Sequence, residues 1–307
     1  MTSRWSTVAV VLFWLTSMGW LVERKIVPSW VVGDPPTYRT VLKDASAEPV
    51  GWAISLDHRP LGWAVCQVCS DAQGAHTVRS RVQFTQVPIV SLAPSWVQSM
   101  LKLLDQQAAQ LRFDLDATTV LGLDPLGRPL EFRSVAELGR LGKRRTIIDP
   151  IVRMGMRGVV EGNQLKLTIR SGESVSRVTT FLPDQAMLGD ALGPQERLPN
   201  LRVGQSWNWP VYNPMRQQME ILQANVEGRD TIHWNKRDRP VLLVELRGDP
   251  GAETTRGQNV RARCWVAPDG LVLAQEVVLG GSRLKFERVP RKAPHEPTLD
   301  DPLEPWW

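Results

Sequence analysis

Apolar and polar residues alternate with a period of two through much of the chain. Residues 111–117, LRFDLDA, place Leu111, Phe113 and Leu115 on one side of an extended backbone and charged residues on the other. The same alternation recurs in three other segments, residues 78–84, 164–170 and 283–288. Successive side chains of a β-strand point to opposite faces, so the pattern predicts strands with one buried and one solvated face.

Short turn sequences separate the alternating segments. They are DPLGRP at 124–129, EGNQ at 161–164, RSGES at 170–174, EGRD at 227–230 and APDG at 267–270. Gly, Asp, Asn and Pro favour tight turns, and short strands joined by tight turns without intervening helices are typical of an antiparallel meander. The fold class predicted from this pattern is therefore mainly β.

One segment has a helical period instead. In residues 95–111 the apolar residues recur at spacings of three and four, at Val97, Met100, Leu101, Leu104, Ala108 and Leu111. Ser95 and Gln98 fit a capping box at its start. We therefore expect an inserted amphipathic helix of about four turns, whose apolar stripe covers one face of the sheet.

The longest apolar stretch without a charge lies near the N-terminus, in residues 6–22. At about 1.5 Å per residue it just crosses a hydrocarbon core of roughly 30 Å, so we expect one transmembrane helix within residues 1–26. A cleaved signal peptide is the alternative, but no A-x-A-like cleavage site follows, which favours an uncleaved signal anchor.

A short N-terminal tail before a long β-rich body favours export, which predicts a single-pass membrane protein with an extracytoplasmic domain, periplasmic in a bacterium. The basic residues after the apolar stretch outnumber the single Arg4 before it, and this favours the opposite orientation. The remaining boundaries follow from composition. Residues 27–49 are predicted to be a linker, residues 50–288 the antiparallel β domain, and residues 289–307 a disordered, proline-rich tail.

The basic surplus of the chain is local. Residues 128–170 hold ten Lys or Arg against four acids, a balance of plus six, whereas the whole chain carries plus five. At the centre of this stretch, the loop GRLGKRR offers four side chains for an anionic membrane surface or cell-wall polymer: Arg140, Lys143, Arg144 and Arg145. An ordinary solvated loop is the alternative, and the scarcity of aromatic residues argues against nucleic acid.

Cys66 and Cys69 form a C-x-x-C spacing, and Cys264 is the only other cysteine. In an extended strand, side chains three residues apart point to opposite faces, so Cys66 and Cys69 cannot share one metal ion without a bulge. We interpret them as structural cysteines; a disulfide with Cys264 stays open, and metal or redox chemistry is the least favoured alternative.

Other signals of catalysis are weak. The four histidines lack ligand spacing, and the sequence contains no G-x-S-x-G, H-E-x-x-H or phosphate-binding glycine loop. Asp114 and Asp116 could form a carboxylate pair, but solvated alternation explains both. No catalytic residue, metal site or cofactor is therefore predicted.

Three segments resemble a known group of proteins. They are ISLDHRPLGWAV at 54–65, LPNLRVGQSWNWPVYNP at 198–214 and CWVAPDGLVLAQEV at 264–277. They resemble hairpins and a mid-domain element of exported β domains of unknown function, similar to domains that precede transglutaminase-like domains and to the lipoprotein-carrier fold.

That resemblance implies a strongly curved antiparallel meander, an open half-barrel whose concave face is covered by helices. The helix expected at 95–111 would be such a cover, and its ligand-binding candidates are Trp96, Met100, Leu101 and Leu104.

Two functions from different classes remain. The favoured one is a membrane-anchored, extracytoplasmic binding or scaffolding module for a ligand that is apolar, lipid-like or peptidic. The alternative is an extracytoplasmic carboxylate-dependent hydrolase that uses residues such as Asp114 and Asp116. The sequence names no protein partner.

Overall fold

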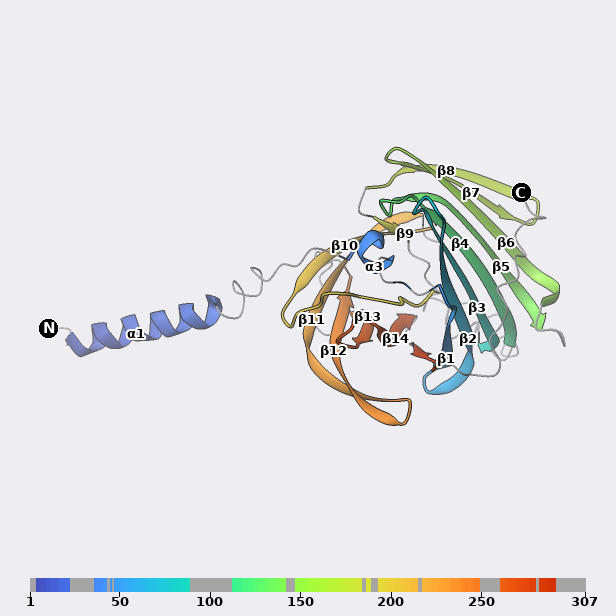
Figure 1. Ribbon diagram of the computed structural model, residues 1–307. Coiled ribbons are helices and arrows are strands. Elements are labelled where there is room, and N and C mark those ends of the chain that lie inside the picture. The colour runs from blue at the N-terminus through green and yellow to red at the C-terminus, as the bar shows by residue number, and fades with distance from the viewer. Residues whose placement is uncertain are drawn as a thin grey trace, which may run out of the picture.

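The structure is a computed structural model. It describes residues 4–22, 36–42, 45, 47–88, 112–141, 147–183, 186–188, 193–214, 217–248, 260–279 and 282–290. Fifteen strands within these ranges form one sheet, in the spatial order β8-β7-β6-β5-β4-β3-β2-β1-β15-β14-β13-β12-β11-β10-β9 (Figure 1).

The strands are β1 (Val50–Leu56), β2 (Arg59–Ser70), β3 (His76–Pro88), β4 (Arg112–Leu123), β5 (Pro129–Leu141), β6 (Ile147–Glu161), β7 (Gln164–Ser171), β8 (Ser174–Phe181), β9 (Met187–Leu188), β10 (Ser206–Asn213), β11 (Gln218–Trp234), β12 (Arg237–Arg247), β13 (Val260–Val266), β14 (Val272–Leu279) and β15 (Ser282–Arg288). All neighbours are antiparallel except β9 and β10, which run parallel. The predicted antiparallel meander is confirmed.

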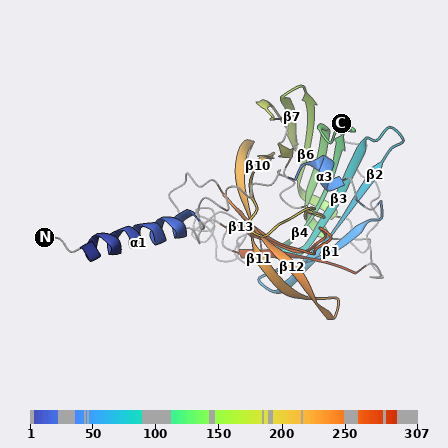
Figure 2. The ribbon, with the colours of Figure 1, turned by 60° about the vertical axis from the view of Figure 1, so that its left-hand side comes forward.

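The sheet is strongly curved and open. We call β1–β8 the first wing and β9–β15 the second wing; the two join where β1 pairs with β15. The wings curve toward each other around a common interior (Figure 1, Figure 2). Within the described residues, β8 and β9 are the two edges of the sheet, so the predicted open, curved architecture is also confirmed.

Tight turns account for the register of the hairpins. Asp57 and His58 both have positive φ angles, 46° and 69°, and close the β1–β2 hairpin. Asn235 and Lys236, with φ angles of 50° and 61°, close the β11–β12 hairpin in the same way. Two consecutive residues with positive φ give the turn whose twist matches that of the flanking strands.

The turn predicted at residues 227–230 is wrong. Strand β11 continues through this segment, and the register shift between Val226 and Gly228 leaves Glu227 as the extra residue of a bulge. A bulge accommodates a residue that has no ladder partner without ending the strand. The local Glu-Gly-Arg-Asp composition therefore resembles a turn although the strand only kinks.

The interior is filled by the apolar residue of each alternating pair. Trp52, Ile54 and Phe286, from the junction of the two wings, are each exposed by no more than 2%. In the first wing, Leu165 and Leu167 point inward while the intervening Lys166 points to solvent, as the alternation predicted. Burial of one face of each strand is the main stabilising contribution to this fold.

Among the described residues, two helices precede the sheet. Helix α1 (Arg4–Leu21) contains the apolar stretch that predicted a helix, and α3 (Tyr38–Leu42) is a single short turn of helix. Among the described residues, no helix combines the length and the apolar character needed to cross a membrane, so the predicted transmembrane span is not shown.

Helix α3 falls within the segment that the sequence assigned to a linker. Val41 and Leu42 are buried at 6% exposure each, and Tyr38 packs against the interior of both wings. In Figure 1, α3 lies between the two wings near β9 and β10. The chain ahead of the β domain is therefore partly built into its core.

Candidate ligand-binding cavity

A cavity of about 400 Å³ lies between the two wings. Apolar side chains from both wings line it, among them Val68, Leu121, Phe132, Trp209, Leu222 and Val277. Cavities of about 300 to 1,000 Å³ with mostly apolar walls and a few polar groups are typical of small-molecule sites. This is the strongest candidate site in the part of the chain that the structure describes.

Helix α3 covers one part of the cavity. Tyr38, Val41 and Leu42 line it, and the Tyr38 hydroxyl donates to the main-chain oxygen of Leu188 at 3.2 Å. This hydrogen bond joins α3 to β9 at the edge of the second wing. The helix is thereby held over the interior by one polar contact and two buried apolar side chains.

A second cover is the segment 193–198, which lies against the hairpin of β13 and β14. The Gln195 amide donates to Gln275 Oε1 at 2.8 Å, and the Leu198 amide donates to the Gly270 oxygen at 2.8 Å. Gly270 has a φ of 82°, and a Cβ there would approach Pro199 Cα to 2.9 Å. Only glycine fits this turn while leaving room for the segment.

Glu196, in the middle of this segment, brings a carboxyl group into the wall of the cavity. Its Oε1 is buried and has no hydrogen-bond partner among the described residues. Burial raises the pKa of Glu196 from 4.5 to about 6, and the nearby charges of Arg288 and Arg197 offset this only in part. A buried carboxyl group with a raised pKa can accept a hydrogen bond from a bound molecule near neutral pH, or transfer a proton to or from it.

Trp209 adds a second unsatisfied polar atom to the wall. Its side chain is 6% exposed, and its indole Nε1 is buried without an acceptor among the described residues. Buried indole N–H groups usually have an acceptor. Glu196 and Trp209, two residues of the cavity wall, therefore each carry a buried polar atom without a partner among the described residues.

Two of the three cysteines also line the cavity. Cys66 and Cys264 are buried, whereas Cys69 is exposed, and none of the three cysteines is in a disulfide. The predicted opposite orientation of Cys66 and Cys69 is confirmed. Burial raises the pKa of the Cys264 thiol to about 12, so it is protonated and unreactive at neutral pH.

Most site residues proposed from the sequence cannot be placed. Trp96, Met100, Leu101 and Leu104, together with the helix expected at 95–111, lie outside the described residues, as do Lys143, Arg144 and Arg145. Arg140 is exposed near the end of β5.

Asp114 and Asp116 are placed, and both lie away from the cavity. Asp116 receives two hydrogen bonds from Arg81, at 3.1 and 2.7 Å, while Asp114 accepts the Gln86 amide at 2.8 Å. Paired guanidinium–carboxylate contacts of this kind fix neighbouring strands. The two carboxylates therefore have structural contacts within the sheet.

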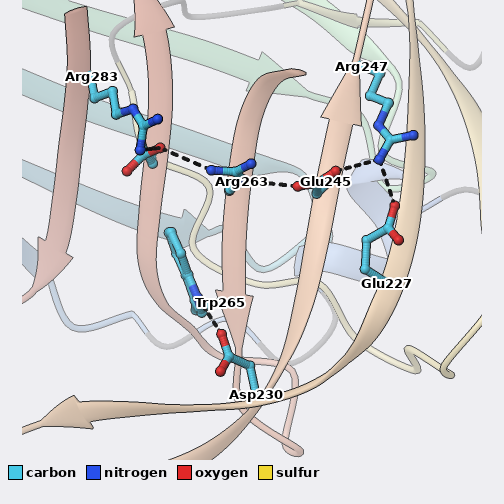
Figure 3. Close-up of polar contacts among 8 residues, drawn as sticks. Glu227, Asp230, Glu245, Arg247, Arg263, Trp265 and Arg283 are labelled. Atoms are coloured by element: carbon cyan, nitrogen blue, oxygen red, sulfur yellow. Dashed lines mark hydrogen bonds and ion pairs between the residues drawn. The ribbon is translucent and has the colours of Figure 1, made fainter. Parts of the chain in front are cut away.

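A larger polar cluster lies on the outer face of the second wing (Figure 3). Acidic and basic side chains alternate across β11–β15, in the order Glu227, Arg247, Glu245, Arg263, Glu276 and Arg283. We call this set the outer ladder. Opposite charges on directly paired strands stabilise a sheet, and these charges neutralise one another.

Among the described residues, no three His, Cys, Asp or Glu side chains are grouped so that they could hold a metal ion.

Sequence reasoning missed Glu196, Trp209 and α3. The segment 193–198 and α3 have no repeating period, and their roles depend on contacts with strands distant in sequence. The one local signal is that Glu196 is a charged residue within a proline-flanked, otherwise featureless stretch between strands.

Comparisons with known proteins leave the chain without a family. No protein-family profile and no curated protein matches it. Among solved structures, it is similar to a beta-barrel-like protein of domain of unknown function DUF1849 from Brucella abortus. The two share 11% identity and a TM-score of 0.47 over 78% of this chain and 94% of that chain. That protein, too, is a β domain of unknown function.

Proposed function

We propose that this chain is a binding module that holds an apolar, lipid-like ligand in the cavity between its two wings. The observation that carries the proposal is the cavity itself, about 400 Å³ in volume and lined mainly by apolar side chains. Apolar ligands are stabilised in such a site because binding removes their surface from water. The hydrolase alternative has no comparable support, because Asp114 and Asp116 lie outside the cavity.

The proposal includes attachment to a membrane through α1, with the β domain on the extracytoplasmic side. Within α1, the apolar side chains of residues 10–20 are exposed, among them Phe13 at 74%, Trp14 at 59% and Trp20 at 59%. Such a surface favours a membrane interface over water. Deleting residues 1–30 should move the protein from the membrane fraction to the soluble fraction; a full-length protein found in the soluble fraction would contradict attachment.

Filling the cavity tests the binding proposal. Ala262 lines the cavity, and Ala262→Phe should reduce its volume and weaken binding of a neutral fluorescent probe, N-phenyl-1-naphthylamine, about tenfold or more. The matched control is Ala53→Phe, because Ala53 is exposed on the outer face of β1. Probe titration of the full chain measures both variants.

Two results would contradict the binding proposal. One is a folded wild-type chain that takes up no probe. The other is equal loss of probe binding in both variants, since that would place the probe outside the cavity.

A further inference from the structure

The polar groups around the cavity are mostly occupied. Gln275 Oε1 accepts the Gln195 amide at 2.8 Å, and Thr119 Oγ1 lies 3.0 Å from Ser134 Oγ. Arg197 donates to the Asp269 main-chain oxygen at 3.0 Å. Against this background, Glu196 Oε1 and Trp209 Nε1 are exceptions, because each is buried in the wall and lacks a partner among the described residues.

The main chain fixes the position of Glu196. Its main-chain oxygen accepts the Val272 amide at 3.1 Å, and the adjacent Arg197 forms a β-bridge with Leu271. The carboxyl group is therefore carried by a segment tied to β14, and its location does not depend on a flexible loop.

The guanidinium group of Arg288, whose charge acts on Glu196, is bound to main-chain oxygens. Arg288 Nη1 donates to the main-chain oxygens of Glu196 at 3.3 Å and Val272 at 3.5 Å. Its guanidinium carbon lies 5.6 Å from the centre of the Trp52 ring, within the range of a cation–π contact. Arg288 thus affects Glu196 through its charge, while the Glu196 Oε1 atom is left for another donor.

A buried polar atom without a partner is costly, and in folded proteins such atoms usually bind water or a ligand. In an apolar cavity large enough for a small molecule, the partner can belong to the ligand. We propose that the cavity selects an uncharged amphiphile whose hydroxyl or amide N–H donates to Glu196 Oε1 while its hydrocarbon body fills the apolar part. This inference rests on the proposed function and names the chemistry of its ligand.

An uncharged head group fits the cavity best, because a charged one would lose its hydration among mostly apolar walls. An anionic head would in addition meet the Glu196 carboxylate. An oxygen atom in an uncharged head can accept the indole N–H of Trp209. A ligand with one donor and one acceptor therefore matches the two unsatisfied atoms of the wall.

A matched pair of probes tests this selectivity. 1-Decanol and its methyl ether have the same hydrocarbon chain and the same oxygen acceptor, but only the alcohol has a donor. The full chain is equilibrated in non-ionic detergent micelles that contain equal mole fractions of the alcohol and the ether, and is then isolated by gel filtration. Gas chromatography measures the amounts of the two compounds that remain with the protein. Protein-free micelles treated in the same way give the reference ratio.

The wild-type chain should be enriched in the alcohol over the ether by about tenfold, as expected for one hydrogen bond to a charged acceptor. Glu196→Met removes the acceptor and should bring the ratio to about one. Glu196→Gln keeps a carbonyl oxygen and should give an intermediate ratio. Glu287→Gln, on the outer face of β15, is the control and should retain the wild-type ratio.

The outcomes separate this inference from the proposed function. Equal enrichment of alcohol and ether in the wild type overturns the inference and leaves the apolar cavity as a binding site. An alcohol preference that survives in both Glu196 variants overturns it as well. If neither compound is enriched, the proposed function fails too. Near-UV circular dichroism checks that each variant is folded. If Glu196→Met does not fold, the alcohol-to-ether ratio of Glu196→Gln is compared with that of the wild type instead.

Discussion

Glu196, in the wall of the cavity, and Glu245, in the outer ladder, each lie near two arginines, yet their pKa values move in opposite directions. Burial opposes ionisation of Glu245, but hydrogen bonds from Arg247 at 2.6 Å and Arg263 at 2.9 Å outweigh it, so the pKa is lowered. At Glu196 burial prevails and raises the pKa to about 6.

Direct hydrogen bonding accounts for the difference. In the outer ladder, the arginines contact the carboxylate, whereas at the cavity Arg288 donates to main-chain oxygens and acts on Glu196 only through space. A charged group with satisfied hydrogen bonds contributes to folding, and an unsatisfied one is available for a ligand. The comparison indicates a structural role for the outer face, and it fits the binding role that we propose for the interior.

The largest effect that tests this comparison is expected in the outer ladder. Glu245→Ala removes the carboxylate that joins Arg247 and Arg263, and should lower the free energy of unfolding by about 2 to 3 kcal/mol. The stabilisation should be present above pH 4.5 and be lost as the pH falls below it, because the folded-state pKa is the lower one. Urea unfolding at several pH values measures both.

The exposed pair of Lys285 and Glu287 is the control for that measurement. Its carboxylate is 47% exposed and lies 3.3 Å from Lys285 Nζ. Glu287→Ala should therefore change stability by less than about 1 kcal/mol. Equal losses of stability from Glu245→Ala and Glu287→Ala would mean that the outer ladder contributes no more than an ordinary surface ion pair.

A smaller effect of opposite sign is expected at the cavity. The folded state of Glu196 binds its proton up to about pH 6, above the ordinary value of 4.5. Its contribution to stability is therefore fully present below pH 4.5 and lost as the pH rises through about 6. Glu196→Gln should stabilise the ligand-free chain by about 2 kcal/mol at pH 7.5 and by only a few tenths at pH 4.5.

Unfolding midpoints of wild type and Glu196→Gln across this pH range test the prediction. Destabilisation by Glu196→Gln at pH 7.5 would mean that the carboxylate is satisfied in the folded chain, and the contrast with Glu245 would disappear.

The smallest effect concerns thiol chemistry, with no change in stability expected. Cys69 is exposed, whereas Cys66 and Cys264 are buried in the cavity wall. In the folded chain, a maleimide reagent should modify one thiol quickly and the other two at least about tenfold more slowly. Cys69→Ser should eliminate the fast phase of modification. Adding 1-decanol should slow the modification of Cys66 and Cys264 only. Three thiols reacting at one rate would argue against a closed interior.

Local alternation was enough to predict four of the strands, β3, β4, β7 and β15. Leu165 and Leu167 alternate with Lys166 in the sequence and in the structure, because the two faces of a strand have different surroundings. The same rule correctly separated the side chains of Cys66 and Cys69. It failed at Glu227, since the residues of a bulge and of a turn have the same composition and differ only in what the partner strand does.

The sequence by itself determined the meander, the exposed and buried faces of several strands and four of the turns, because these depend on residues next to one another along the chain. Only the tertiary structure decided which residues form the cavity. Glu196 and α3 have no periodic pattern, and their positions follow from hydrogen bonds to Gly270, Val272 and Leu188. The curvature of the sheet brings these distant segments together, so no local sequence signal could identify them.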